Sequence, residues 1–220
     1  MSLSLLFKDE LKGFYKSKVM ISLWVGLPVV ILLFHLVSPD TGPIPFSTLT
    51  AILLASLGGT LASVMITVSI VNEKNGHVYD LFLVRPVRRM DILVAKFFAV
   101  YICIAIAALL ALAIGFAYDY LSMSGSPEMF LRPTLESFVI SLSMLAVYSA
   151  VGVLIGVASP SVLVGVILII FGGNQLSALP MVLPAFLGPT HYVPLTLILG
   201  VVLTVILLTA AIVVFNRKKL

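Results

Sequence analysis

The stretch EKNGHVYDLFLVRPVRRMDILVAK, residues 73–96, is the one long charged segment in a chain that otherwise consists of apolar runs. Val78, Leu81 and Phe82 recur at helical spacing, which predicts a short amphipathic helix over 74–84. Pro86 ends this helix, because a proline disfavours helical dihedral angles at the residue before it. We therefore predict a helix on the membrane surface between two spans. An ordinary cytoplasmic loop that only sets topology is the alternative interpretation.

Composition predicts that most of the chain lies in lipid. Of its 220 residues, 61% are hydrophobic and 10% are charged, and the mean hydropathy is +1.22. These values exclude a soluble domain and indicate an integral membrane protein. The net charge of +4 does not indicate a nucleic-acid partner, because the basic residues gather at the ends of apolar runs, as topology signals do.

The apolar runs predict six membrane-spanning helices, since about 20 apolar residues cross the hydrocarbon core. An amphipathic helix over 2–18 precedes them and is predicted to lie at the membrane interface. A signal peptide is the rival interpretation there, but the apolar run that follows is too long for one. The predicted fold is a single all-α transmembrane domain over 1–220, with spans at 19–37, 44–71, 92–118, 134–157, 162–175 and 195–215.

The fifth apolar run is interrupted. The sequence GGNQ occupies 172–175, and the following segment 176–194 is apolar but contains four prolines. We therefore expect the fifth span to end at 175 and a broken segment to follow at the outer face. Irregular backbone at membrane depth is tolerated only where protein or a water-filled cavity surrounds it.

Charge distribution predicts the orientation of the chain. Six spans place both termini on one side, and in this topology every Lys and Arg except Arg132 lies on that side. Basic residues are enriched in cytoplasmic segments, so both termini are predicted to be cytoplasmic.

The charged stretch resembles the loop after the second span of type-2 ABC transporter permeases, the membrane subunits of ATP-driven exporters. The order of an acid, a glycine, a second acid, Pro-Val-x-Arg and Ile-Leu-x-x-Lys carries the likeness. Two departures from the usual pattern are the extra residue after Gly76 and the alanine before Lys96. The matching residues are Glu73, Gly76, Asp80, Pro86, Val87, Arg89, Ile92, Leu93 and Lys96.

The resemblance implies a function and a set of contacts. Residues 73–90 would form the coupling helix, and 176–194 would form short re-entrant helices at the outer face. The permease would act in a prokaryotic cell membrane with a second copy of itself or a similar chain, above two separate ATP-binding subunits. We expect Val78, Leu81 and Phe82 to contact the ATP-binding subunit, and Arg88 and Arg89 to lie nearer the lipid headgroups.

The chain has no phosphate-binding loop, because Gly58-Gly59-Thr60 lacks the lysine that would reach a nucleotide. We therefore expect no ATPase activity, cofactor or metal site in this chain, and ATP with Mg²⁺ only in the partner. The substrate is not readable, although an uncharged apolar path with scattered hydroxyls fits an amphipathic or lipid-like molecule. An ion-coupled carrier or channel is disfavoured by the absence of charge in the middle of the spans. A structural membrane anchor is a further alternative.

Polar residues inside the spans are the candidates for a substrate path. Four hydroxyls in the second span recur at intervals of four, three and four, which predicts one stripe on a helix. Such a stripe either lines a path or holds two helices together, and the Gly152-x-x-x-Gly156 motif is a further packing signal. The candidate path residues are Ser56, Thr60, Ser63, Thr67, Asn174 and Gln175.

Overall fold

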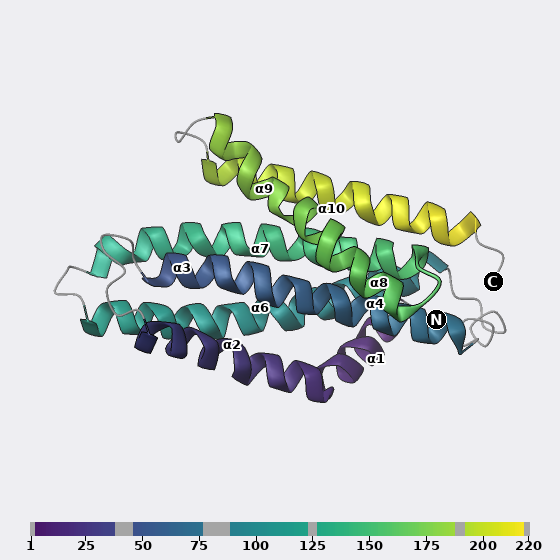
Figure 1. Ribbon diagram of the computed structural model, residues 1–220, viewed down its shortest axis with the longest axis horizontal. Helices are drawn as coiled ribbons and strands as arrows, with labels where there is room; N and C mark the ends of the chain where they lie inside the picture. The colour runs from purple at the N-terminus through teal and green to yellow at the C-terminus, as the bar shows by residue number, and fades with distance from the viewer. Residues whose placement is uncertain (1–2, 38–45, 77–88, 123–126, 188–191, 218–220) are drawn as a thin grey trace.

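Every element that the structure describes is helical (Figure 1). The computed structural model describes residues 3–37, 46–76, 89–122, 127–187 and 192–217. Two short π-helical segments, η1 (Leu54–Gly58) and η2 (Ile169–Gly173), lie inside longer helices. The α-helices are α1 (Leu3–Tyr15), α2 (Lys18–Val37), α3 (Phe46–Leu53), α4 (Gly59–Asn75), α6 (Arg89–Ser122), α7 (Pro127–Ala158), α8 (Val162–Leu168), α9 (Asn174–Leu187) and α10 (Tyr192–Arg217).

Within the described ranges, five helices are long and apolar enough to cross a membrane, which supports the prediction of an all-α membrane protein. The apolar helix α2 has 20 residues and precedes them. Residues 77–84 of the surface helix that we predict over 74–84 lie outside the described residues, as does the rest of the segment to residue 88. The predicted contact residues among them are Val78, Asp80, Leu81, Phe82, Pro86 and Arg88. The five candidate spans are Thr50–Asn75, Met90–Tyr118, Leu131–Ala158, Val162–Pro184 and Tyr192–Arg217.

Helix α7 lies at the centre of the bundle and packs against α3, α4, α6, α9 and α10. Its partner α6 presents buried alanines such as Ala99, Ala107 and Ala111, and small side chains let helix backbones approach closely in lipid. In the last two candidate spans, Val162–Pro184 and Tyr192–Arg217, only 22% and 17% of the apolar window is buried within the chain. Most of their apolar surface therefore remains available to lipid or to another protein.

A helix, α1, occupies Leu3–Tyr15 within the predicted range 2–18, and it is packed onto the bundle. Leu6 and Phe14 of α1 are buried while Lys8 and Lys12 are exposed, and α1 packs against α6. Helix α2 is also held to α6, because the Trp24 indole Nε1 donates a hydrogen bond of 3.1 Å to the Cys103 main-chain oxygen.

The predicted end of the fifth span at residue 175 is wrong. The helix runs through α8, η2 and α9 to Leu187 with Pro180 and Pro184 inside it. Each proline removes one backbone donor, whereas a break at this depth would leave several backbone groups without partners, at several kcal/mol each. A π-helical turn at the glycines therefore takes the place of a break. Helix α10 then begins at Tyr192, three residues before the predicted start.

Candidate functional site

Both flanks of the predicted coupling segment meet at one buried ion pair. Glu73 lies in the last turns of α4, and Lys96 lies in the second turn of α6. The Lys96 Nζ is 2.5 Å from the Glu73 Oε1, and the Lys96 side chain is only 1% exposed. This ion pair joins the base of α4 to the base of α6, so a force on the segment between them acts on both helices.

The same lysine also holds α1. The Glu10 Oε1 lies 2.8 Å from the Lys96 Nζ, and the ring centroid of Phe14 is 5.8 Å from it, within cation–π range. Ser69 of α4 accepts a hydrogen bond of 3.1 Å from Lys96 and donates one of 2.9 Å to Glu73. We call Glu10, Ser69, Glu73 and Lys96 the Lys96 node. It ties three helices together at one end of the bundle.

The Lys96 node holds two carboxylates and one amine, so its acidic charge exceeds its basic charge. Burial raises the pKa of the Glu10 carboxyl above its ordinary value of 4.5, although the charge of Lys96 and its hydrogen bond act in the opposite direction. The negative charges of Glu73 and Asp9 add to the rise. Desolvation of Glu10 therefore outweighs its attraction to Lys96.

This imbalance predicts a pH dependence of stability. Below pH 4.5 Glu10 is protonated in both the folded and unfolded states. As the pH rises through the folded pKa, the folded state must lose a proton that the unfolded state has already released, so the free energy of unfolding falls. We expect Glu10→Gln to remove this fall and to raise the unfolding temperature at pH 8. Thermal unfolding followed by fluorescence of Trp24, the sole tryptophan, measures both. An unchanged pH profile would contradict the assignment.

Other residues of the predicted coupling motif lie at the helix ends beside the Lys96 node. Gly76 is the C-cap of α4, and its amide donates a hydrogen bond of 2.8 Å to the Asn72 main-chain oxygen. Arg89 begins α6. Lys74 donates to the main-chain oxygen of Ser159, in the turn between α7 and α8. The base of α4 is thereby connected to the turn between α7 and α8 as well.

Two of the four hydroxyls assigned to a substrate path join helices instead. The Ser63 Oγ donates to the Tyr148 main-chain oxygen at 2.7 Å, and the Thr67 Oγ1 donates to that of Gly152 at 2.8 Å. Both side chains are 0% exposed. Of the two interpretations of the hydroxyl stripe, contact between helices holds for these residues, and we remove both from the path.

The other two hydroxyls bond within their own helix. Ser56 and Thr60 are partly exposed and donate to the main-chain oxygens of Leu53 and Leu57. Ser56 lies inside η1, and a π-helical segment adds one residue to a turn, which rotates what precedes it by about 100° relative to a regular helix. Ser56 is therefore turned away from the stripe that a regular helix predicts, whereas Thr60 follows η1 and belongs to α4 with Ser63 and Thr67.

Tyr148 connects the two π-helical segments. Its ring lies directly against Gly59, the residue after η1, where a Cβ atom would overlap it. Its hydroxyl donates to the Oδ1 of Asn174, the residue after η2. Asn174 and Gln175 are otherwise exposed on the fifth span. π-Helical turns occur often at functional sites, so this contact between α4, α7 and α9 is a candidate pivot.

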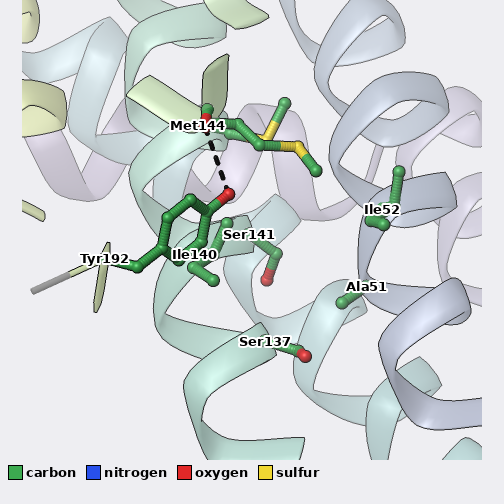
Figure 2. A pocket seen from close by; sticks show the side chains of 8 residues that line it. Ala51, Ile52, Ser137, Ile140, Ser141, Met144 and Tyr192 are labelled. Atoms are coloured by element: carbon green, nitrogen blue, oxygen red, sulfur yellow. Dashed lines mark hydrogen bonds between the residues drawn. The ribbon is translucent and has the colours of Figure 1, made fainter. Parts of the chain in front are cut away.

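A cavity of about 190 Å³ lies between four helices (Figure 2). Across it the Tyr192 hydroxyl donates a hydrogen bond of 3.1 Å to the Met181 main-chain oxygen. None of the site residues predicted from the sequence lines this cavity. The sequence signal that could have found one wall of the cavity is the pair Ser137 and Ser141, which lie four residues apart in α7 and so on one face of the helix. It is lined by Ala51, Ile52, Ser137, Ile140, Ser141, Met144, Met181 and Tyr192.

No protein-family model matches the chain. No curated protein matches it either. Among the described residues, no group of three or more His, Cys, Asp or Glu side chains gathers where it could hold a metal ion.

Proposed function

We propose that this chain is the transmembrane permease subunit of a type-2 ABC exporter, in which separate subunits hydrolyse ATP. The observation that supports this most strongly is the Lys96 node. The segment that resembles a coupling helix is flanked by Glu73 and Lys96, which pair with each other and with Glu10 of α1. A force applied there by an ATP-binding subunit would reach three helices at once, which is what a coupling element requires.

The proposed topology has six traverses with cytoplasmic termini in a prokaryotic cell membrane. In Figure 1 both chain ends lie at the same end of the bundle as the C-terminal end of α4. Such a chain crosses an even number of times, so α2 would supply a sixth traverse beside the five long spans. The basic residues concentrated at that end favour the cytoplasmic side.

The proposed substrate path runs along the second and fifth spans, next to a second copy or a similar permease. Asn174 follows the start of α8 by 12 residues, so it lies about 18 Å along the helix, within the membrane. Exposed amides at that depth need protein or water around them rather than lipid. Ser56, Thr60, Asn174 and Gln175 remain the path candidates, and they suit an amphipathic or lipid-like substrate.

ATP-driven closure of the cytoplasmic subunits would shift the two permeases as rigid bodies between two arrangements. The Lys96 node would carry the force into α1, α4 and α6. The Tyr148 contact with Gly59 and Asn174 would carry it on between the second, fourth and fifth spans.

The test is co-purification with an ATP-binding subunit. We expect the chain alone to hydrolyse no ATP. We expect Leu81→Asp and Phe82→Asp to dissociate the ATP-binding subunit and to abolish the ATPase activity that the complex shows. Membrane insertion should persist, because each variant only places a charge in an apolar contact with that subunit. Leu121→Asp is the matched control, since Leu121 is 82% exposed at the far end of α6. If both coupling variants keep full complex yield, segment 73–90 is only a topology loop. If the neighbouring gene encodes an oxidoreductase in place of an ATPase, the interpretation as a structural membrane anchor is favoured.

A further inference from the structure

The cavity between α3, α7, α9 and α10 has no part in the proposed path. Helix α7 forms its floor, with α3 on one side and α9 with α10 on the other (Figure 2). Ala51 and Tyr192 lie in the first turns of their candidate spans, whereas Met144 follows Leu131, the first residue of its span, by 13 residues. At 1.5 Å per residue that is roughly 20 Å, so the cavity extends from a membrane interface into the hydrocarbon region.

Among the residues that the structure describes, the lining is almost entirely apolar and includes no charged side chain. Two of its three hydroxyls are engaged: Tyr192 donates to the Met181 main-chain oxygen, and Ser141 donates to that of Phe138 at 2.8 Å. The third belongs to Ser137, which is partly exposed and makes no hydrogen bond to another described residue. In Figure 2 its hydroxyl points from α7 toward the α3 wall.

These features select one ligand chemistry. A cavity of about 150 Å³ with an apolar lining stays dry and can take up a hydrocarbon ligand. This cavity, of about 190 Å³, is larger. Ile52, at the α3 wall, is 44% exposed, so the cavity opens beside a lipid-accessible side chain. None of the described lining residues supplies a cation for a buried carboxylate or phosphate, and burying an unpaired charge is costly. A hydroxyl can instead bond to Ser137 at little cost.

We propose that this cavity binds a single hydrocarbon chain ending in an uncharged hydroxyl group. The hydroxyl lies at Ser137, near the interface, and the chain runs inward between Met144 and Met181. Methionine side chains adapt to irregular apolar surfaces, which suits a flexible chain. Binding needs no ATP-binding subunit, so the assignment goes beyond the proposed function and does not depend on it.

The test uses a long-chain alcohol that carries a diazirine in mid-chain, in phosphatidylcholine nanodiscs containing the purified chain. Irradiation and peptide mass spectrometry should locate saturable labelling around Met144 and Met181. Ser137→Ala should raise the half-saturating probe concentration about two- to tenfold, the range for one hydrogen bond. A fatty-acid probe with the same diazirine should label more weakly, because its end is charged. Equal labelling by both probes in wild type and Ser137→Ala would overturn the role of Ser137.

Two further variants block the cavity, and a third serves as a control. Ile52→Trp at the mouth and Met181→Trp inside should each remove most labelling, and two independent positions guard against loss of folding in either variant. Ala113→Trp is the matched control, since Ala113 lines a groove of about 240 Å³ between α6 and α7. Labelling that does not saturate, or that is as strong at Leu109 and Ala113 as at Met144, would show only surrounding lipid and would overturn the proposal.

Discussion

Lys96→Met should lower the free energy of unfolding by about 3 kcal/mol, the lower end of the range for removing one partner of a buried ion pair. The substitution keeps the apolar stem but leaves the carboxylates of Glu10 and Glu73 facing each other without a cation. Their side chains are 24% and 25% exposed, so water relieves part of this cost. Detergent-induced unfolding, followed by Trp24 fluorescence, measures the change.

The companion variants separate charge from packing. Lys12→Met removes an exposed lysine of α1 and should leave stability unchanged. Adding Glu10→Gln and Glu73→Gln to Lys96→Met should recover much of the loss, because no unpaired charge then remains. Stability of Lys96→Met equal to that of Lys12→Met would mean that the Lys96 node does not hold the three helices together.

Gly152→Ala should destabilise the chain by about 2 kcal/mol, within the range for overpacking a close contact. An added Cβ would lie 2.7 Å from the main-chain oxygen of Ser63 and 2.8 Å from its Cα. These are backbone atoms of the neighbouring helix and cannot rotate away, so α4 and α7 must separate. The hydrogen bonds from Ser63 and Thr67 to α7 would lengthen as a result.

Gly172→Ala is the matched control for this helix contact. Nothing lies within 4 Å of the position that its Cβ would take. We expect a change smaller than about 1 kcal/mol, in the stabilising direction because alanine has the higher helix propensity. Thermal unfolding of the two variants under identical detergent conditions compares them directly. Equal loss in both would show that helix propensity, rather than the contact with α4, determines the cost.

The class of fold could be predicted from the sequence because its cause is local. Apolar runs of about 20 residues form helices in lipid, where each backbone polar group must find a partner within its own segment. For the same reason the fifth span continues past Gly172 and Gly173, where helix propensity alone predicts an end. The sequence pattern also singled out Glu73 and Lys96, but it contained no information that their side chains pair across 23 residues.

The roles of polar residues inside the bundle were decided by tertiary structure. Ser56 and Ser63 share one stripe in a regular helix, yet η1 divides them, and only Ser63 reaches α7. The sequence by itself determined that the chain forms apolar helices, with a charged segment at 73–96 between two of them. Which helix faces meet, and where a cavity remains between them, depends on packing between segments far apart in the chain. That packing energy belongs to pairs of helices, so no single segment encodes it.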